Sequence, residues 1–163
     1  MKNIVYLFIF TIAFTTNAQK NLEQLLKKFN TESVPYISVT DLKKSSNITL
    51  LDAREPKEFK VSHIENAICV GYDNFNLKET LTNLPSDKNA KIVVYCSLGI
   101  RSEDIAEKLH KAGYTNIYNL YGGIFEWKNQ NNSVVNKQNK TTDKIHTFNK
   151  EWSKWLTKGK KVY

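Results

Sequence analysis

The sequence predicts an α/β fold in which helices cover both faces of a parallel sheet. Segments with strand character alternate along the chain with segments whose apolar residues recur at helical spacing, and this alternation is typical of parallel strands joined by helices. Residues 92–95, IVVY, are apolar throughout, as expected for a strand buried on both faces. The 163 residues, of which 40% are hydrophobic, are enough for one domain with a core.

The individual elements follow from local patterns. Leu22, Leu25, Leu26 and Phe29 fall at helical spacing and predict a helix over 21–30. Thr40 can cap a helical turn. The other expected strands are 36–39, 48–53, 68–70, 91–95 and 116–120, and the other expected helices are 55–60, 77–84, 103–112 and a turn over 123–127.

The two ends of the chain differ from this central part. Residues 1–18 have one Lys, a short apolar run and small polar residues, which is the plan of a secretory signal peptide. We therefore expect export to the periplasm or the exterior, with an uncleaved N-terminal anchor as the alternative. The division expected is a signal peptide over 1–18, a helix within 19–32 and a catalytic domain over 33–128.

Residues 129–163 are expected to form a basic linker and a C-terminal helical tail. The linker is rich in Asn, Lys and Thr, and the helix is predicted from five apolar residues at helical spacing, Ile145, Phe148, Trp152, Trp155 and Leu156. Residues 19–127 hold fourteen basic and fourteen acidic side chains, whereas 128–163 hold nine Lys and two acids. Such a tail can contact an anionic membrane surface or an acidic partner, or form a solvated Lys-rich face. The charge gives no reason to expect a nucleic acid.

The main functional signal is Cys96 and the residues after it. A predicted buried strand ends at this cysteine, the loop contains Gly99 and Arg101, and Ser102 and two acids then open a predicted helix. A helix N-terminus presents unpaired N–H groups and a positive dipole end, which lower the pKa of a nearby thiol. The alternative is a buried cysteine that only packs. We favour a site that stabilises a thiolate or an anion on the sulfur.

Four segments together resemble the rhodanese-type sulfurtransferases. CSLGIRS (96–102) is similar to the active-site loop of that family, and LLDAREPKEF (50–59), SHIENAICV (62–70) and GYTNIYNLYGGIFEW (113–127) resemble three further segments in the same order. The resemblance covers about 33–128. It implies a rhodanese-like α/β fold with a five-stranded, mainly parallel sheet.

The same resemblance implies a sulfurtransferase with no cofactor. Cys96 would be the nucleophile that carries sulfane sulfur as a persulfide, and the substrate-binding loop would be Ser97, Leu98, Gly99, Ile100, Arg101 and Ser102. The expected donor is thiosulfate, polysulfide or a protein persulfide, and the expected acceptor is a thiol or cyanide. Four residues separate Cys96 from Arg101, whereas tyrosine-phosphatase-type loops have five, so phosphatase chemistry is the weaker alternative.

Several other residues are expected to support this loop. Asp52, Arg54 and Glu58 are expected to form a structural network, in which Arg54 and Glu58 have the spacing of an i,i+4 pair. His63 is expected to order a loop. No cluster of ligands at metal-binding spacing is present, so no metal is expected. Cys69, in the apolar run AICV, is expected to pack rather than to pair with the proposed nucleophile.

The loop also departs from the family pattern in ways that leave a second function open. Ser97 replaces a basic residue that thiosulfate-preferring members often carry, and Leu98 and Ile100 make the loop more apolar. Strong thiosulfate:cyanide activity is therefore not expected. The second hypothesis is a non-catalytic binding module on the same scaffold, which recognises a partner through the loop and the basic tail.

Overall fold

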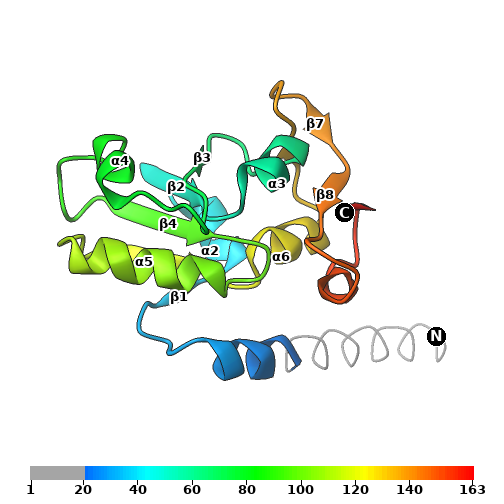
Figure 1. Ribbon diagram of the computed structural model, residues 1–163, viewed down its shortest axis with the longest axis horizontal. Helices are drawn as coiled ribbons and strands as arrows, with labels where there is room; N and C mark the ends of the chain where they lie inside the picture. The colour runs from blue at the N-terminus through cyan, green and yellow to red at the C-terminus, as the bar shows by residue number, and fades with distance from the viewer. Residues whose placement is uncertain (1–20) are drawn as a thin grey trace, which may run out of the picture. The chain divides into compact units, whose positions relative to one another are not determined.

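Strand β4 (Lys91–Tyr95) lies at the centre of a five-stranded sheet. It pairs in parallel with β2 (Ile48–Asp52) on one side and with β5 (Ile117–Leu120) on the other. The edge strands are β3 (Ile68–Cys69) beside β2 and β1 (Tyr36–Ile37) beside β5. This strand order confirms the predicted parallel α/β architecture. Figure 1 shows β2 and β4 of the sheet together with helix α5, which packs against β4.

Successive side chains of a strand point to opposite faces of the sheet, so each face presents its own apolar residues for packing. Ile92 and Val94 pack in one cluster with Ile105 and Leu109, which belong to helix α5 (Arg101–Lys111). Val93 and Tyr95 point the other way and are also fully buried. The other α-helices within residues 33–163 are α2 (Val39–Lys44), α3 (Pro56–Val61), α4 (Leu77–Thr82) and α6 (Gly123–Asn129).

The region after α6 differs from the prediction. The expected linker contains a hairpin of β6 (Val134–Val135) and β7 (Thr141–Thr142), and the expected helical tail contains a parallel pair, β8 (Lys144–His146) and β9 (Lys160–Val162). Between them lies one short 3₁₀ helix, η1 (Trp152–Trp155). The prediction of a helical tail is therefore wrong. The apolar spacing fitted a helix, but Ile145 is buried in a strand and Phe148 has a left-handed φ of 65°, which no α-helix accommodates.

The computed structural model describes residues 21–163. Residues 21–29 are helical, as predicted, and belong to a unit that is distinct from the unit formed by residues 33–163. The expected signal peptide, 1–18, lies outside the described residues. Over the described part of the chain, no helix has the length and apolar character needed to cross a membrane.

Candidate active site

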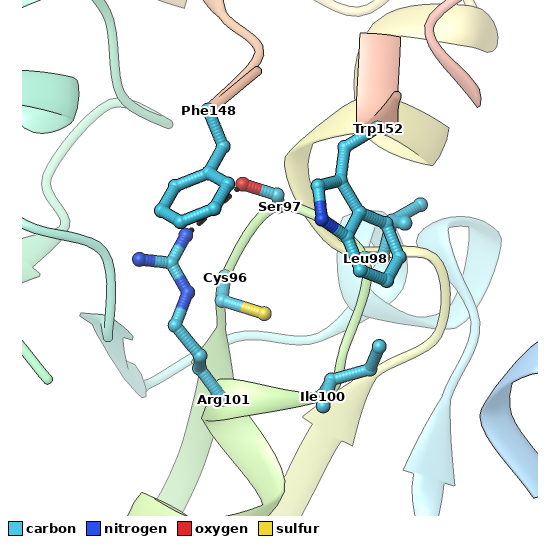
Figure 2. A pocket seen from close by; sticks show the side chains of 7 residues that line it. All are labelled: Cys96, Ser97, Leu98, Ile100, Arg101, Phe148 and Trp152. Carbon is cyan, nitrogen blue, oxygen red and sulfur yellow. Dashed lines mark hydrogen bonds between the residues drawn. The ribbon is translucent and has the colours of Figure 1, made fainter. Parts of the chain in front are cut away.

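Cys96 follows the last residue of β4, at the carboxyl end of the central strand. Ligands of open α/β sheets bind at this end of the strands. Helix α5 begins five residues later, at Arg101, so the sulfur lies beside the positive end of an eleven-residue helix. Cys96 is only 2% exposed, and Figure 2 shows its Sγ pointing into the space between the loop and Trp152.

Hydrogen-bond donors of Gly99 and Ser102 lie close to the sulfur. The Gly99 amide donates to Sγ at 3.1 Å, and the Ser102 amide also hydrogen-bonds to it. The position of Ser102 suggested that its side chain caps α5, but it does not. It lies inside the first turn because the helix starts at Arg101 with Ile100 as the N-cap residue, and its hydroxyl lies 3.5 Å from Sγ.

Asn119 holds this loop and is a residue that the sequence analysis missed. It is fully buried on β5. Its side-chain amide donates to the Gly99 carbonyl at 2.7 Å, and its Oδ1 accepts from the Ser102 hydroxyl at 2.7 Å. Both partners contact the sulfur, so Asn119 positions them. The available signal was one polar residue within the otherwise apolar strand IYNL.

Arg101 provides the positive charge of the site, and a carboxylate holds it in place. Its Nη1 and Nη2 donate to the two oxygens of Glu58 at 2.8 and 3.0 Å. Nη2 also donates to the Ser97 hydroxyl at 3.2 Å, the contact drawn in Figure 2. The guanidinium lies 5.4 Å from the ring centroid of Phe148. A bidentate pair of this kind fixes the guanidinium in one orientation beside the loop.

These groups together favour the thiolate of Cys96. Burial raises the pKa of this thiol, but the charge of Arg101, the Ser102 hydroxyl and the amides of Gly99 and Ser102 lower it by more, so the net pKa lies below the ordinary cysteine value. For Cys69 burial also raises the pKa, and the nearby Asp52 charge raises it further, to about 11. The pKa values of the two thiols are therefore shifted in opposite directions, that of Cys96 downward and that of Cys69 upward.

The contrast predicts different pH dependences for alkylation of the two thiols. Because the thiolate is the reacting form, iodoacetamide is expected to modify Cys96 at a lower pH than Cys69. Arg101→Met is expected to raise the midpoint for Cys96, since it removes the largest contribution that lowers its pKa. Peptide mass spectrometry across a pH series measures both midpoints. A Cys96 midpoint at or above that of Cys69 would contradict this electrostatic account.

Helix α6 supports the loop from behind. The amides of Ile124 and Phe125 donate to the carbonyls of Cys96 and Ser97 at 2.9 and 3.2 Å. Gly123 has a φ of 54°, and a Cβ there would lie 2.3 Å from the Cys96 carbonyl oxygen, closer than atoms can approach. The GG pair of the closing segment therefore lets the first turn of α6 approach and bind these carbonyls.

The proposed supporting residues form two ion pairs, not the Arg54–Glu58 pair that their spacing suggested. Arg54 donates from Nη2 to Asp52 at 2.6 Å and from the same atom to the Ser62 carbonyl at 2.7 Å. Glu58 instead pairs with Arg101. The i,i+4 geometry did not decide the pairing because Arg54 lies before the first turn of α3, which starts at residue 56.

His63 orders a connection, as expected, and does not line the cavity beside Cys96. Its ring stacks on Phe59 with centroids 3.7 Å apart, and its Nδ1 lies 3.0 Å from the Phe59 carbonyl. Its backbone exchanges two hydrogen bonds with Val135 of β6, at 2.8 and 2.9 Å. His63 thus joins the region after α6 to the rest of the unit.

A cavity of about 180 Å³ opens beside the sulfur. Its floor comes from the Cys96 loop, including the side chains of Leu98 and Ile100. Its other wall comes from Phe148 and Trp152 (Figure 2), which belong to the segment between β8 and β9. Sequence reasoning missed these two residues as parts of the site because it assigned them to a distant helical tail.

Neither cysteine forms a disulfide in the structure. The thiol of Cys69 lies 3.8 Å from the Arg54 carbonyl, to which it donates a weak hydrogen bond. Among residues 21–163, no group of three or more His, Cys, Asp or Glu side chains is arranged to hold a metal ion.

The fold and the site define a class of protein, one with a buried cysteine of lowered pKa in a strand–loop–helix element of a parallel α/β sheet. The model of the rhodanese-like domain matches residues 38–130, which is more than half of the 163 residues. The chain belongs to the rhodanese-like domain family. A rhodanese-related protein from Thermoplasma volcanium shares 33% identity, with a TM-score of 0.54 over 62% of this chain and 97% of that one.

Curated relatives carry several activities. The chain is 36% identical over 83 residues to a probable adenylyltransferase/sulfurtransferase MoeZ from Mycobacterium tuberculosis. The matched segment covers 51% of this chain and 21% of that protein. It is 38% identical over 79 residues to a tRNA uridine(34) hydroxylase from Erwinia tasmaniensis, covering 47% of this chain and 23% of the other. A thiosulfate sulfurtransferase from Pseudomonas aeruginosa shares the fold, at 18% identity and a TM-score of 0.58 over 85% of this chain and 26% of that one. The chain thus spans about a fifth to a quarter of the curated relatives.

Proposed function

We propose that this protein is a sulfurtransferase that carries sulfane sulfur on Cys96. In the first step, the Cys96 thiolate attacks the outer sulfur of a donor. The bond between that sulfur and the rest of the donor breaks, and its electron pair leaves with the donor remnant. In the second step, a nucleophilic acceptor attacks the same sulfur, and the electron pair of the S–S bond returns to Sγ. The thiolate is regenerated without a net change of electrons and without a cofactor.

The observation that carries this proposal is the set of donors around Sγ. The amides of Gly99, at 3.1 Å, and of Ser102 donate to the sulfur, and Arg101 adds positive charge. The Ser102 hydroxyl oxygen lies 3.5 Å from the sulfur while its proton is donated to Asn119. Preorganised donors stabilise an anion without reorganisation during the reaction. The persulfide is also an anion, with its charge mainly on the outer sulfur, so the positive end of α5 and Arg101 favour it as well.

The net charge of the site affects which sulfur donor it favours. Arg101 is already paired with Glu58, whose own pKa is lowered because the hydrogen bonds and charge of Arg101 outweigh the effect of burial. The carboxylate therefore offsets the guanidinium, and the loop adds the uncharged Ser97 and Leu98. A doubly charged donor such as thiosulfate or an inorganic polysulfide gains little attraction here, so a singly charged persulfide is the donor that fits better.

A second candidate is a binding module that uses the same cavity without chemistry. The observation in its favour is the apolar wall of Phe148 and Trp152 beside the loop. The surroundings of Cys96 favour the enzyme, because a cavity that only binds an apolar group has no use for amides directed at a thiolate.

Sulfur loading distinguishes the two functions. The protein is incubated with polysulfide, freed of excess reagent and treated with cyanide, and thiocyanate is measured. The sulfurtransferase is expected to release about one thiocyanate per chain, as a single covalent carrier requires. Absence of releasable sulfur at any donor concentration would exclude the sulfurtransferase and leave the binding module.

A further inference from the structure

The segment between β8 and β9 supplies two of the seven residues that line the cavity beside Cys96. Phe148, Trp152, Leu98 and Ile100 all line the cavity into which Sγ points (Figure 2), so four apolar side chains surround the position that a sulfane sulfur on Cys96 would occupy. The cavity measures about 180 Å³. Apolar cavities of about 150 Å³ hold a molecule of benzene, so this one has room for one ring-sized hydrocarbon group.

The backbone at Phe148 is held in a conformation that an aromatic residue rarely adopts. Its φ is 65°, and positive φ at a bulky residue is an outlier that marks a local constraint. The surroundings impose it: the Phe148 amide donates to His146 Nδ1 at 3.1 Å, and the preceding Thr147 amide donates to the Val162 carbonyl of β9 at 2.8 Å. The result is a ring placed beside the Arg101 guanidinium at the mouth of the cavity.

The charges around the cavity disfavour a second negative group. Arg101 and Glu58 cancel as a bidentate pair, so a persulfide on Cys96 leaves the site with a net negative charge. Beyond Cys96, the cavity lining contains no charged side chain other than Arg101 among the described residues. An acceptor with an additional anionic group would meet repulsion and would have to desolvate that group against the two aromatic rings.

We propose that the acceptor is a small thiol whose sulfur is attached to an uncharged, ring-sized apolar group, with Phe148 and Trp152 as the residues that select it. This inference rests on the proposed sulfurtransferase function. The acceptor thiolate attacks the outer sulfur of the Cys96 persulfide, and a new S–S bond forms. The bond from that sulfur to Sγ breaks, its electron pair stays on Sγ, and the acceptor leaves as a persulfide. The proton that the acceptor thiol loses on ionising passes to solvent.

The rates of reaction with two acceptors, measured separately, test this selectivity. Protein loaded with polysulfide is mixed with benzyl mercaptan or with 2-mercaptoethanesulfonate, two alkyl thiols of similar acidity, and the second-order rate of persulfide loss is measured by mass spectrometry. Cyanide serves as an acceptor without an organic group. The wild type is expected to prefer benzyl mercaptan over the sulfonate by at least about tenfold, the scale on which an apolar pocket discriminates.

Two variants connect the preference to the cavity. Phe148→Asn removes the ring but suits the left-handed backbone, because Asn tolerates positive φ better than other non-glycine residues. Combined with Trp152→Ala, it is expected to reduce the preference to about threefold or less. Trp155→Ala is the matched control, since it removes an indole of the same 3₁₀ helix that does not line the cavity. It is expected to retain the wild-type ratio. Each ratio compares two acceptors on one protein, so differences in folded fraction cancel.

The possible failures are distinguishable. If the loaded wild type reacts with cyanide but treats both thiols alike, the selectivity proposal is overturned and the sulfurtransferase stands. If Trp155→Ala loses the preference as fully as the double variant, the cavity is not its source and the proposal is overturned as well. If no sulfur can be loaded, the proposed function itself fails.

Discussion

Cys96→Ser is expected to reduce sulfur transfer from polysulfide to cyanide by at least about 1,000-fold. The serine hydroxyl is not ionised near neutral pH, so the surrounding amides have no anion to stabilise in the resting site. An oxygen at this position also cannot form the S–S bond that the proposed mechanism requires. The initial rate of thiocyanate formation, compared with the rate in the absence of protein, measures the loss.

Cys69→Ser is the matched control for this substitution. Cys69 is half-buried at the end of an edge strand, and its thiol contacts the Arg54 carbonyl rather than the cavity. Burial and nearby negative charge raise its pKa to about 11, which leaves little thiolate at neutral pH. It is expected to retain wild-type turnover. Equal losses in the two variants would mean that Cys96 has no special role in transfer.

Asp52→Asn is expected to lower the free energy of unfolding by about 3–5 kcal/mol. Asp52 and Arg54 are both completely buried. Asp52 accepts the Arg54 backbone amide at 2.9 Å and its Nε at 3.0 Å in addition to the ion pair. The amide of asparagine preserves the shape but removes the negative charge, so the guanidinium is left buried without its counter-ion. Urea denaturation followed by circular dichroism measures the change.

Two further variants test whether the unpaired charge is the cause. Arg54→Met added to Asp52→Asn removes the buried cation and is expected to recover part of the lost stability, because apolar replacement of a whole buried pair is often close to neutral. Asp143→Asn breaks the Lys128–Asp143 pair, in which the carboxylate is 79% exposed, and is expected to cost less than about 1 kcal/mol. Equal costs for Asp52→Asn and Asp143→Asn would show that burial does not govern these pairs.

The parts of the fold that were predictable are those in which local pattern and tertiary structure agree. The apolar run 92–95 became the central strand, and the loop from Cys96 to Arg101 leads into a helix as expected. Arg101, Gly99 and Cys96 could be assigned to one site because they are close in sequence. Their roles follow from short-range geometry that a strand, a tight loop and a helix start impose together.

The remaining contributions to the site come from residues distant in sequence. Asn119 contacts the loop from β5, the strand beside β4, and Glu58 reaches Arg101 from α3, which follows β2. Phe148 and Trp152 reach the cavity through a pairing of β8 with β9, two three-residue strands. Such short strands leave no clear periodicity in sequence, and five apolar residues at helical spacing fitted a helix equally well.

Peptide-level localisation of the transferred sulfur tests the central claim most directly. The protein is incubated with polysulfide, blocked with an alkylating reagent, digested and sequenced by tandem mass spectrometry. One additional sulfur is expected on the peptide containing Cys96 and none on the peptide containing Cys69. A loaded protein whose extra sulfur resides on Cys69, or a Cys96 peptide that stays unmodified at saturating polysulfide, would contradict it.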